Sequence, residues 1–158
     1  MHNIIFINQQ TYKDSLVGEQ LLHLTEKAVY LDGNWCCYNE DLTFDETCLN
    51  LAADNMVYLI NNYILSNKFN NIIIGWKFEN EFIKKIIKYL NCQNYHIYYF
   101  ILTNTDSATI DNFELMDKEY EKDYIPLTSD RLIKISKIDT TDISAFKIAY
   151  VLSEIIKR

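Results

Sequence analysis

The sequence predicts an α/β fold, a three-layer α/β/α sandwich around a parallel sheet of about five strands. Continuous apolar runs rich in β-branched residues recur along the chain, for example at 4–7 and 72–74. Such runs are typical of strands that are buried on both faces of a parallel sheet. Segments with apolar residues at helical spacing separate the runs. Right-handed crossovers between parallel strands then place helices on both faces of the sheet.

Strands and helices are expected to alternate along the whole chain. The expected strands cover 4–8, 28–31, 71–76, 95–102 and 132–138. The expected helices cover 15–24, 44–66, 82–90, 107–122 and 143–157. We expect Ser15 to cap the first helix, and Thr43 to open the second in a capping box with Glu46. The second half of that helix is apolar on most sides, which predicts a position deep between other elements.

Length and composition predict one packed domain over residues 1–158. The 15 basic and 22 acidic residues give a net charge of −7, which argues against a nucleic-acid partner. No export leader and no membrane-length apolar run is found, so we expect a cytoplasmic protein without a membrane partner. The four cysteines at 36, 37, 48 and 92 lack metal-ligand spacing, and no metal is expected.

Four short segments of the chain look familiar, namely 4–8, 19–21, 29–35 and 138–140. Together they resemble small bacterial P-loop nucleotide-kinase-like proteins, a group with AAA-family ATPases and shikimate- or chloramphenicol-kinase-like phosphotransferases. The resemblance covers nearly the whole chain by element order, with the specific motifs mainly in its first quarter. It implies a P-loop NTPase-like sheet with strand order 2-3-1-4-5. In that family a Gly-rich turn ending in Gly-Lys-Ser or Gly-Lys-Thr follows the first strand.

The sequence departs from the family at this turn, so its Walker A loop is degenerate. The turn Gln9–Asp14 has no glycine, whereas a phosphate cradle needs backbone N–H groups that converge on the anion. Lys13 and Ser15 are the remnants of the family's Lys-Ser pair. Asp14 lies between them and brings a negative charge to the helix N-terminus, where a phosphate would lie.

Two further parts of a kinase site are missing from the sequence. The third strand ends Ile74-Gly75-Trp76-Lys77 and supplies no carboxylate for magnesium. The segment 103–129 contains no arginine, although the family's kinases carry arginines over the phosphates there. Three losses together indicate a site that no longer transfers phosphate.

Asp32 is the candidate catalytic residue, because it ends the second predicted strand at the sheet edge where α/β folds place ligands. In the resembling phosphotransferases an acid there receives the proton of the substrate hydroxyl; the alternative is an ordinary Asp-Gly turn. For each of the remaining candidates, the alternative to a ligand contact is partial burial, a solvated surface position or helix capping. They are Lys13, Ser15, Arg131 and Thr140 for nucleotide or phosphate, and Trp35, Tyr38, Trp76 and Lys77 for a ligand pocket.

The leading hypothesis is a degenerate P-loop kinase-like pseudoenzyme without phosphotransfer, which binds a small ligand or a protein partner and needs no cofactor. The alternative is an active ATP-dependent kinase of a small molecule or nucleotide, with an atypical loop and with ATP and magnesium as cofactors. A third hypothesis is a structural homodimer. It would pair through Tyr95–Phe100 or through the helix that carries Lys84, Lys85 and Lys88.

Overall fold

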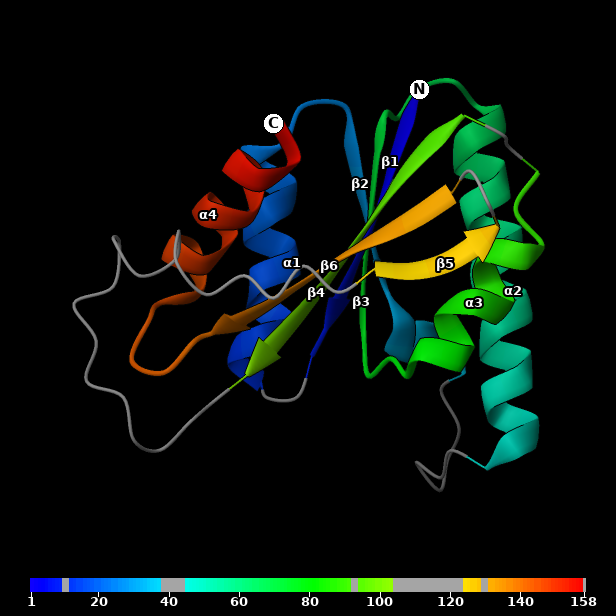
Figure 1. Cartoon of the computed structure of the whole chain (residues 1–158), viewed down its shortest axis with the longest axis horizontal. Coiled ribbons are helices and arrows are strands. Elements are labelled where there is room, and N and C mark those ends of the chain that lie inside the picture. Colours follow the sequence, from blue (N-terminus) through cyan, green and yellow to red (C-terminus); the bar gives the residue numbers. More distant parts are fainter. Residues whose placement is uncertain (10–11, 38–44, 92–93, 104–123, 129–130, 158) are drawn as a thin grey trace.

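The computed structural model describes residues 1–9, 12–37, 45–91, 94–103, 124–128 and 131–157. Its strands and helices alternate from the N-terminus (Figure 1). The strands are β1 (His2–Asn8), β2 (Ala28–Asp32), β3 (Asn71–Trp76), β4 (Tyr95–Thr103), β5 (Tyr124–Thr128) and β6 (Arg131–Asp139). The helices are α1 (Tyr12–Leu24), the short 3₁₀ helix η1 (Gly33–Cys36), α2 (Glu46–Leu65), α3 (Asn80–Lys88) and α4 (Ala145–Lys157).

The strands form one sheet in the order β2-β3-β1-β4-β6-β5. The first five of these are parallel, and they confirm the predicted order 2-3-1-4-5, with β6 as the fifth parallel strand. The sixth strand, β5, pairs antiparallel with β6 and was not predicted. It contains Pro126, which is compatible with an edge position because proline has no backbone N–H to donate to a neighbouring strand.

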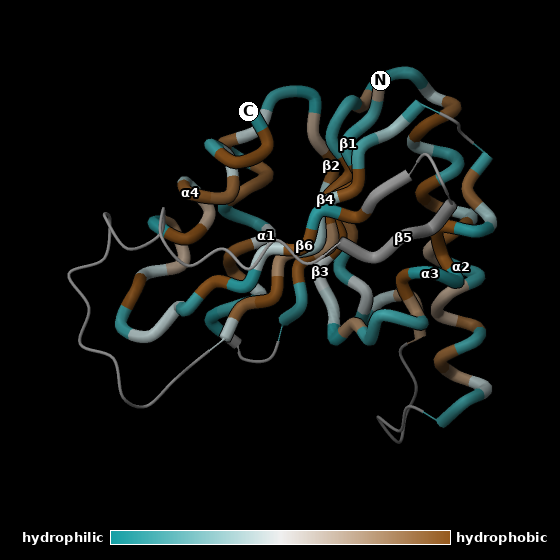
Figure 2. Tube along the Cα trace, in the orientation of Figure 1, coloured by the Kyte–Doolittle hydropathy of each residue, from teal (hydrophilic) through white to brown (hydrophobic). Residues whose placement is uncertain are grey.

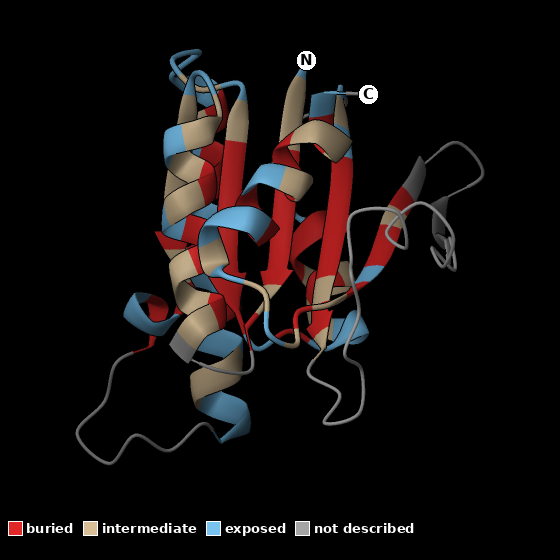
Figure 3. Ribbon diagram, turned by 90° about the vertical axis from the view of Figure 1, so that its left-hand side faces the viewer, coloured by how far each residue is buried: buried red, intermediate tan, exposed pale blue. Residues whose placement is uncertain are grey.

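Helices cover both faces of the sheet, with α1 and α4 on one side and α2 and α3 on the other (Figure 1). Strand β1 supplies both cores in alternation. Ile4 and Phe6 belong to the core under α2 and α3, whereas Ile5 and Ile7 belong to the core under α1 and α4. Apolar residues therefore concentrate along the central strands (Figure 2), which are buried (Figure 3). This double burial explains the unbroken apolar run in the sequence.

The helix starts differ from the predicted ones. Helix α1 begins at Tyr12, so Ser15 lies inside it and not at the N-cap position. The carboxylate of Asp14 in the first turn favours this earlier start, because a negative charge there interacts well with the helix dipole. The N-cap of α2 is Asp45, which accepts a hydrogen bond from the Cys48 amide at 2.8 Å. The predicted cap, Thr43, lies outside the described residues.

Helix α2 lies at the surface of the molecule, and the prediction of a deep position for its second half was wrong. One face is buried against the sheet, through residues that include Met56 and Ile60. On the opposite face the side chains of Tyr58 and Leu65 are 68% and 67% exposed. The apolar residues on most sides of α2 therefore do not reflect burial on most sides.

The predicted helix 107–122 and Cys92 lie outside the described residues. Cys36, Cys37 and Cys48 are not joined in a disulfide. Within the described part of the chain, no helix has both the length and the apolar character needed to cross a membrane.

Because β1 is buried on both faces, we expect Phe6→Ala to destabilise the protein by about 3–5 kcal/mol. The lost ring leaves a cavity beneath Phe78, whose ring centroid lies 5.2 Å from that of Phe6 in an edge-to-face contact. Urea unfolding followed by circular dichroism measures the change. Phe146→Ala is the matched control, since Phe146 is exposed on α4 and should change the stability by less than about 0.5 kcal/mol. Equal effects of the two substitutions would contradict the assigned core.

Candidate functional site

The carboxyl ends of the parallel strands meet at one edge of the sheet, and ligands of open α/β folds bind at this edge. The turn after β1 and the first turn of α1 lie there, as do the segments that follow β2, β3 and β6. Residues 10–11 of the turn lie outside the described residues. Gln9, Lys13, Asp14 and Ser15 on either side of them are described and define the candidate site.

The Lys13 ammonium donates a hydrogen bond to the backbone carbonyl of Thr140 at 2.5 Å. Thr140 directly follows β6, and β4 lies between β6 and β1 in the sheet. The Lys13 side chain therefore links the first turn of α1 to the segment between β6 and α4. Asp14 beside it is almost fully buried, and Ser15 follows in the body of α1, half-buried.

Thr140 is itself part of the frame of this edge. It is buried, its amide donates to the Thr103 carbonyl at 2.8 Å, and its hydroxyl donates to the same oxygen at 3.0 Å. Asp139 beside it accepts hydrogen bonds from the amide and the hydroxyl of Thr141, at 2.9 and 2.7 Å. Arg131 lies at the start of β6, at the opposite end of that strand from Thr140. The structure thus brings Lys13 and Thr140 together and leaves the Arg131 backbone apart from them.

Gln9 fills the space above the end of β3. Its side chain is buried and donates from Nε2 to the Tyr30 hydroxyl at 2.9 Å. It lies directly over Gly75, where a Cβ atom would come within 2.0 Å of Gln9 Nε2 and 2.7 Å of the Tyr30 hydroxyl. Burial raises the pKa of Tyr30 to about 12, although the hydrogen bond from Gln9 opposes this rise. Gln9, Tyr30 and Gly75 therefore form a closed polar contact, which we call the Gln9 cluster.

A second polar contact lies on the other face of the sheet at the same edge. The Asn8 amide donates to the Tyr99 hydroxyl at 3.2 Å and to the Phe78 carbonyl at 3.3 Å, and its oxygen accepts from the Phe78 amide. The Tyr99 hydroxyl in turn donates to the Phe78 carbonyl at 3.0 Å. Burial raises the pKa of Tyr99 to about 12. These bonds tie the end of β1 and the middle of β4 to the segment between β3 and α3.

Asp32 caps the short helix η1 that follows β2. Its carboxylate accepts a hydrogen bond from the Asn34 amide at 2.9 Å, as expected of the Asp-Gly turn alternative. Burial raises the pKa of the Cys36 thiol to about 11, and the nearby negative charge of Asp32 contributes to this rise. The residue is half-buried at the predicted edge, and the structure shows this capping contact for it.

The predicted aromatic pocket is not assembled from its described members. Trp76 is buried in an aromatic cluster with Phe78 and Phe82, with ring centroids 6.1 and 5.1 Å away. Its ring is covered by Gly33, whose missing Cβ would lie 2.5 Å from Trp76 Cγ. Trp35 is 77% exposed, and Lys77 is exposed. Tyr38 lies outside the described residues.

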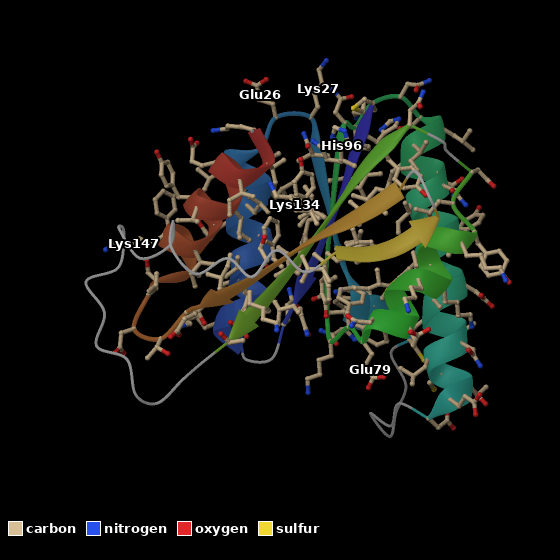
Figure 4. The ribbon with its side chains drawn as sticks, viewed as in Figure 1. Glu26, Lys27, Glu79, His96, Lys134 and Lys147 are labelled. Carbon is tan, nitrogen blue, oxygen red and sulfur yellow. The ribbon has the colours of Figure 1, made fainter. Side chains whose placement is uncertain are left out.

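Sequence reasoning missed Gln9, Tyr30 and Glu79 at this edge. Glu79 is the N-cap residue of α3 and makes no side-chain cap bond; Figure 4 shows it at the end of the molecule opposite Glu26 and Lys27. No group of three or more metal-ligating side chains occurs among the residues that the structure describes. The sequence signal that could have identified Glu79 is a carboxylate three residues after the end of a predicted strand.

Comparisons with known proteins connect this architecture to kinases. The structure is similar to a candidate kinase from Chloroflexus aurantiacus, with a TM-score of 0.55, 9% identity and coverage of 99% of this chain and 96% of that chain. It is also similar to thymidylate kinase from Candida albicans, with a TM-score of 0.52, 12% identity and coverage of 99% and 91%. The fold is P-loop kinase-like. No protein-family model and no curated protein matches the sequence.

The raised pKa of Tyr30 predicts a pH dependence of stability. Between about pH 10 and pH 12 the unfolded chain releases the Tyr30 proton while the folded protein keeps it, so stability falls as the pH rises through this window. Tyr30→Phe should make this fall shallower, and it should cost about 1 kcal/mol below pH 10 by leaving the Gln9 amide without the hydroxyl. Urea midpoints across this pH range measure both effects.

The matched control is Tyr58→Phe, because Tyr58 is mainly exposed on α2. This variant should keep the wild-type dependence on pH. If Tyr30→Phe also keeps it, Tyr30 loses its proton at the same pH in the folded and unfolded states, and the closed Gln9 cluster is wrong.

Proposed function

We propose that this protein is a P-loop kinase-like pseudoenzyme, which binds a small ligand or a protein partner without transferring phosphate and without a nucleotide or metal cofactor. The observation that carries the proposal is the contact of the Lys13 ammonium with the Thr140 carbonyl. In a phosphate-binding loop this ammonium would contact the phosphates. Here it holds two segments of the protein together.

Electrostatics support the proposal. The carboxylate of Asp14 is buried in the first turn of α1, where the helix dipole would otherwise attract a phosphate. A triphosphate brought to this turn would meet a carboxylate at close range. No glycine in 9–14 relieves the crowding of the backbone, and no carboxylate lies in the segment that ends β3 to recruit magnesium in compensation.

Packing supports it as well. The Gln9 side chain occupies the space over Gly75, between the end of β1 and Tyr30 on β2. Groups that a ligand would have to displace are thus already hydrogen-bonded to one another. The exposed side chains at this edge, Trp35 and Lys77, are the ones we propose for contact with the ligand or partner, with Asp32 beside them.

An active kinase is the second candidate function, and one observation favours it. Lys13 lies in the first turn of the helix that follows β1, in a fold that resembles a thymidylate kinase over 99% of this chain. In this reading Lys13 leaves Thr140 when ATP and magnesium bind, and Asp32 accepts the proton of a nucleotide or small-molecule hydroxyl. The two candidates therefore differ in whether Lys13 leaves Thr140 when ATP and magnesium are present.

We expect Lys13→Ala to lower the free energy of unfolding by about 1–3 kcal/mol, because it removes a charged donor from the Thr140 carbonyl. Urea unfolding measures this loss. Calorimetric titration of the wild-type protein with ATP and magnesium should show no binding in the micromolar range, and no ATP turnover should be found. Lys147→Ala on the exposed face of α4 is the control, with a change below about 0.5 kcal/mol.

The opposite pattern would support the kinase. Micromolar ATP binding, with ATP turnover that Lys13→Ala abolishes, would overturn the pseudoenzyme proposal. In that case Asp32→Asn should also abolish transfer, with nearly unchanged stability because asparagine can still accept the bond from the Asn34 amide.

A further inference from the structure

The thiols of Cys37 and Cys48 lie against each other between η1 and α2. Cys37 directly follows η1 as its C-cap residue, and Cys48 is in the first turn of α2. A hydrogen bond joins the two side chains. Cys37 is buried in the core under α2 and α3, and the half-buried Cys48 packs against the same core. Two thiols in contact are the starting arrangement for a disulfide.

The packing of α2 on η1 places Cys48 on the side of the helix that meets Cys37. Asn55 of α2 donates a hydrogen bond to the Cys36 carbonyl at 2.8 Å. Cys48 precedes Asn55 by nearly two full helical turns, so both side chains lie on the same side of α2. Asp45 accepts a hydrogen bond from the Cys48 amide at 2.8 Å and fixes the start of the helix. Hydrogen bonds at both ends of this contact therefore hold the two thiols in place.

Cys36 is a useful contrast, because it is adjacent to Cys37 and is buried to a similar extent. Burial raises the pKa of the Cys36 thiol to about 11. A thiol of this kind is unreactive and packs as a small apolar side chain. The pKa of the Cys37 thiol is raised first by its hydrogen bond with Cys48 and then by burial. The two neighbours thus differ in that the Cys37 thiol contacts a thiol of α2.

We propose that Cys37 and Cys48 are a modification site, a dithiol that a low-molecular-weight disulfide oxidises reversibly to a Cys37–Cys48 disulfide. The proposal is independent of the proposed function, because it requires neither a ligand nor a partner at the candidate site. Disulfides that form in contact with a glutathione pool are usually transient, and they serve in catalysis or in redox sensing. Glutathione disulfide is therefore the oxidant that we consider.

The oxidation consists of two thiol–disulfide exchanges. Cys48 is the more accessible of the two thiols, and it reacts first. It loses its proton, its sulfur attacks one sulfur of glutathione disulfide, and one glutathione leaves and takes up the proton. Cys37 then loses its proton and attacks Cys48 Sγ, which breaks the mixed disulfide and releases the second glutathione in the same way. Two protein thiols are oxidised to one disulfide, and one glutathione disulfide is reduced to two thiols.

The disulfide would tie the end of η1 to the start of α2. It closes the chain over residues 38–47, and a closed loop of this size should raise the melting temperature by about 5–10 °C, because it constrains the unfolded chain. Since η1 begins directly after Asp32 and contains Trp35, oxidation would also fix this part of the sheet edge to α2.

Disulfide mapping tests the pair in the wild-type protein. The reduced chain is equilibrated with buffers of increasing glutathione disulfide content, the remaining thiols are alkylated, and the chain is cleaved after glutamate. Glu40 and Glu46 lie between the two cysteines. Mass spectrometry should therefore find the peptides 27–40 and 47–79 joined, with Cys36 alkylated, and dithiothreitol should separate them. Peptides that stay separate in the most oxidising buffer, or a joint between 47–79 and the peptide of Cys92, would overturn the proposal.

Single substitutions identify the two sulfurs. Cys36→Ala is the matched control, and it should still give the joined peptides and the rise in melting temperature on oxidation. Cys37→Ala and Cys48→Ala should each lose both. Circular dichroism melts in reduced and oxidised buffers measure the rise. Loss of the joined peptides in Cys36→Ala, with their retention in Cys37→Ala, would assign the bond to the wrong neighbour and would contradict the proposed pair.

Discussion

The burial of β1 on both of its faces is the constraint on which the rest of the structure depends. Its apolar residues alternate between the two cores, and the strand pairs with β3 on one side and with β4 on the other. Every helix must then lie on one of the two faces to cover them. The same central position places the end of β1, with Asn8 and Gln9, in the middle of the edge where a ligand would bind. The pair Asn8 and Gln9 therefore belongs both to the end of the buried central strand and to the candidate site.

At that edge, hydrogen bonds within the protein take the place that a ligand has in an open site. Asn8 joins the end of β1 to Tyr99 of β4 and to the segment after β3 on one face. Gln9 closes over Gly75 on the other face, and Lys13 reaches Thr140 beyond β4. Each of these groups is buried or half-buried, so releasing it to a ligand would cost the internal bond first. The raised pKa values of Tyr30 and Tyr99 have the same origin, since both hydroxyls lie in these contacts and are desolvated.

The fold was predictable because its signals are local. Runs such as 72–74 and the spacing of Phe82, Ile83, Ile86 and Ile87 identify strands and helices without knowledge of their neighbours. Strand β5 was missed because it is short and contains a proline, and only its pairing with β6 makes it a strand. The start of α2 was misplaced since both Thr43 and Asp45 have capping side chains. The exposure of one face of α2 was not predicted, because exposed apolar residues give the same sequence pattern as core residues.

The candidate site was predictable only as a location. Asp32, Lys13 and Thr140 were placed at the correct edge by the order of the elements, but their contacts join residues far apart in the sequence. Trp76 illustrates the difference. A tryptophan at a strand end suggests a pocket, yet its ring is buried because Gly33, more than forty residues earlier, has no side chain to hold η1 away from it. Contacts of this kind leave no periodic pattern in the sequence.

The absence of glycine from the turn after β1 is linked to the presence of Gly75 on the neighbouring strand β3. A phosphate-binding turn needs glycines because the anion takes the space next to the backbone. Here the turn has side chains instead, and the buried Gln9 amide needs room of its own. Gly75 supplies this room, since any Cβ there would come within 2.0 Å of Gln9 Nε2. The two positions are therefore coupled: a side chain at Gly75 requires Gln9 to leave, and a small residue at position 9 would leave Tyr30 and Gly75 facing an open space. The loss of glycine in the turn and the bare position on β3 are two parts of one packing arrangement.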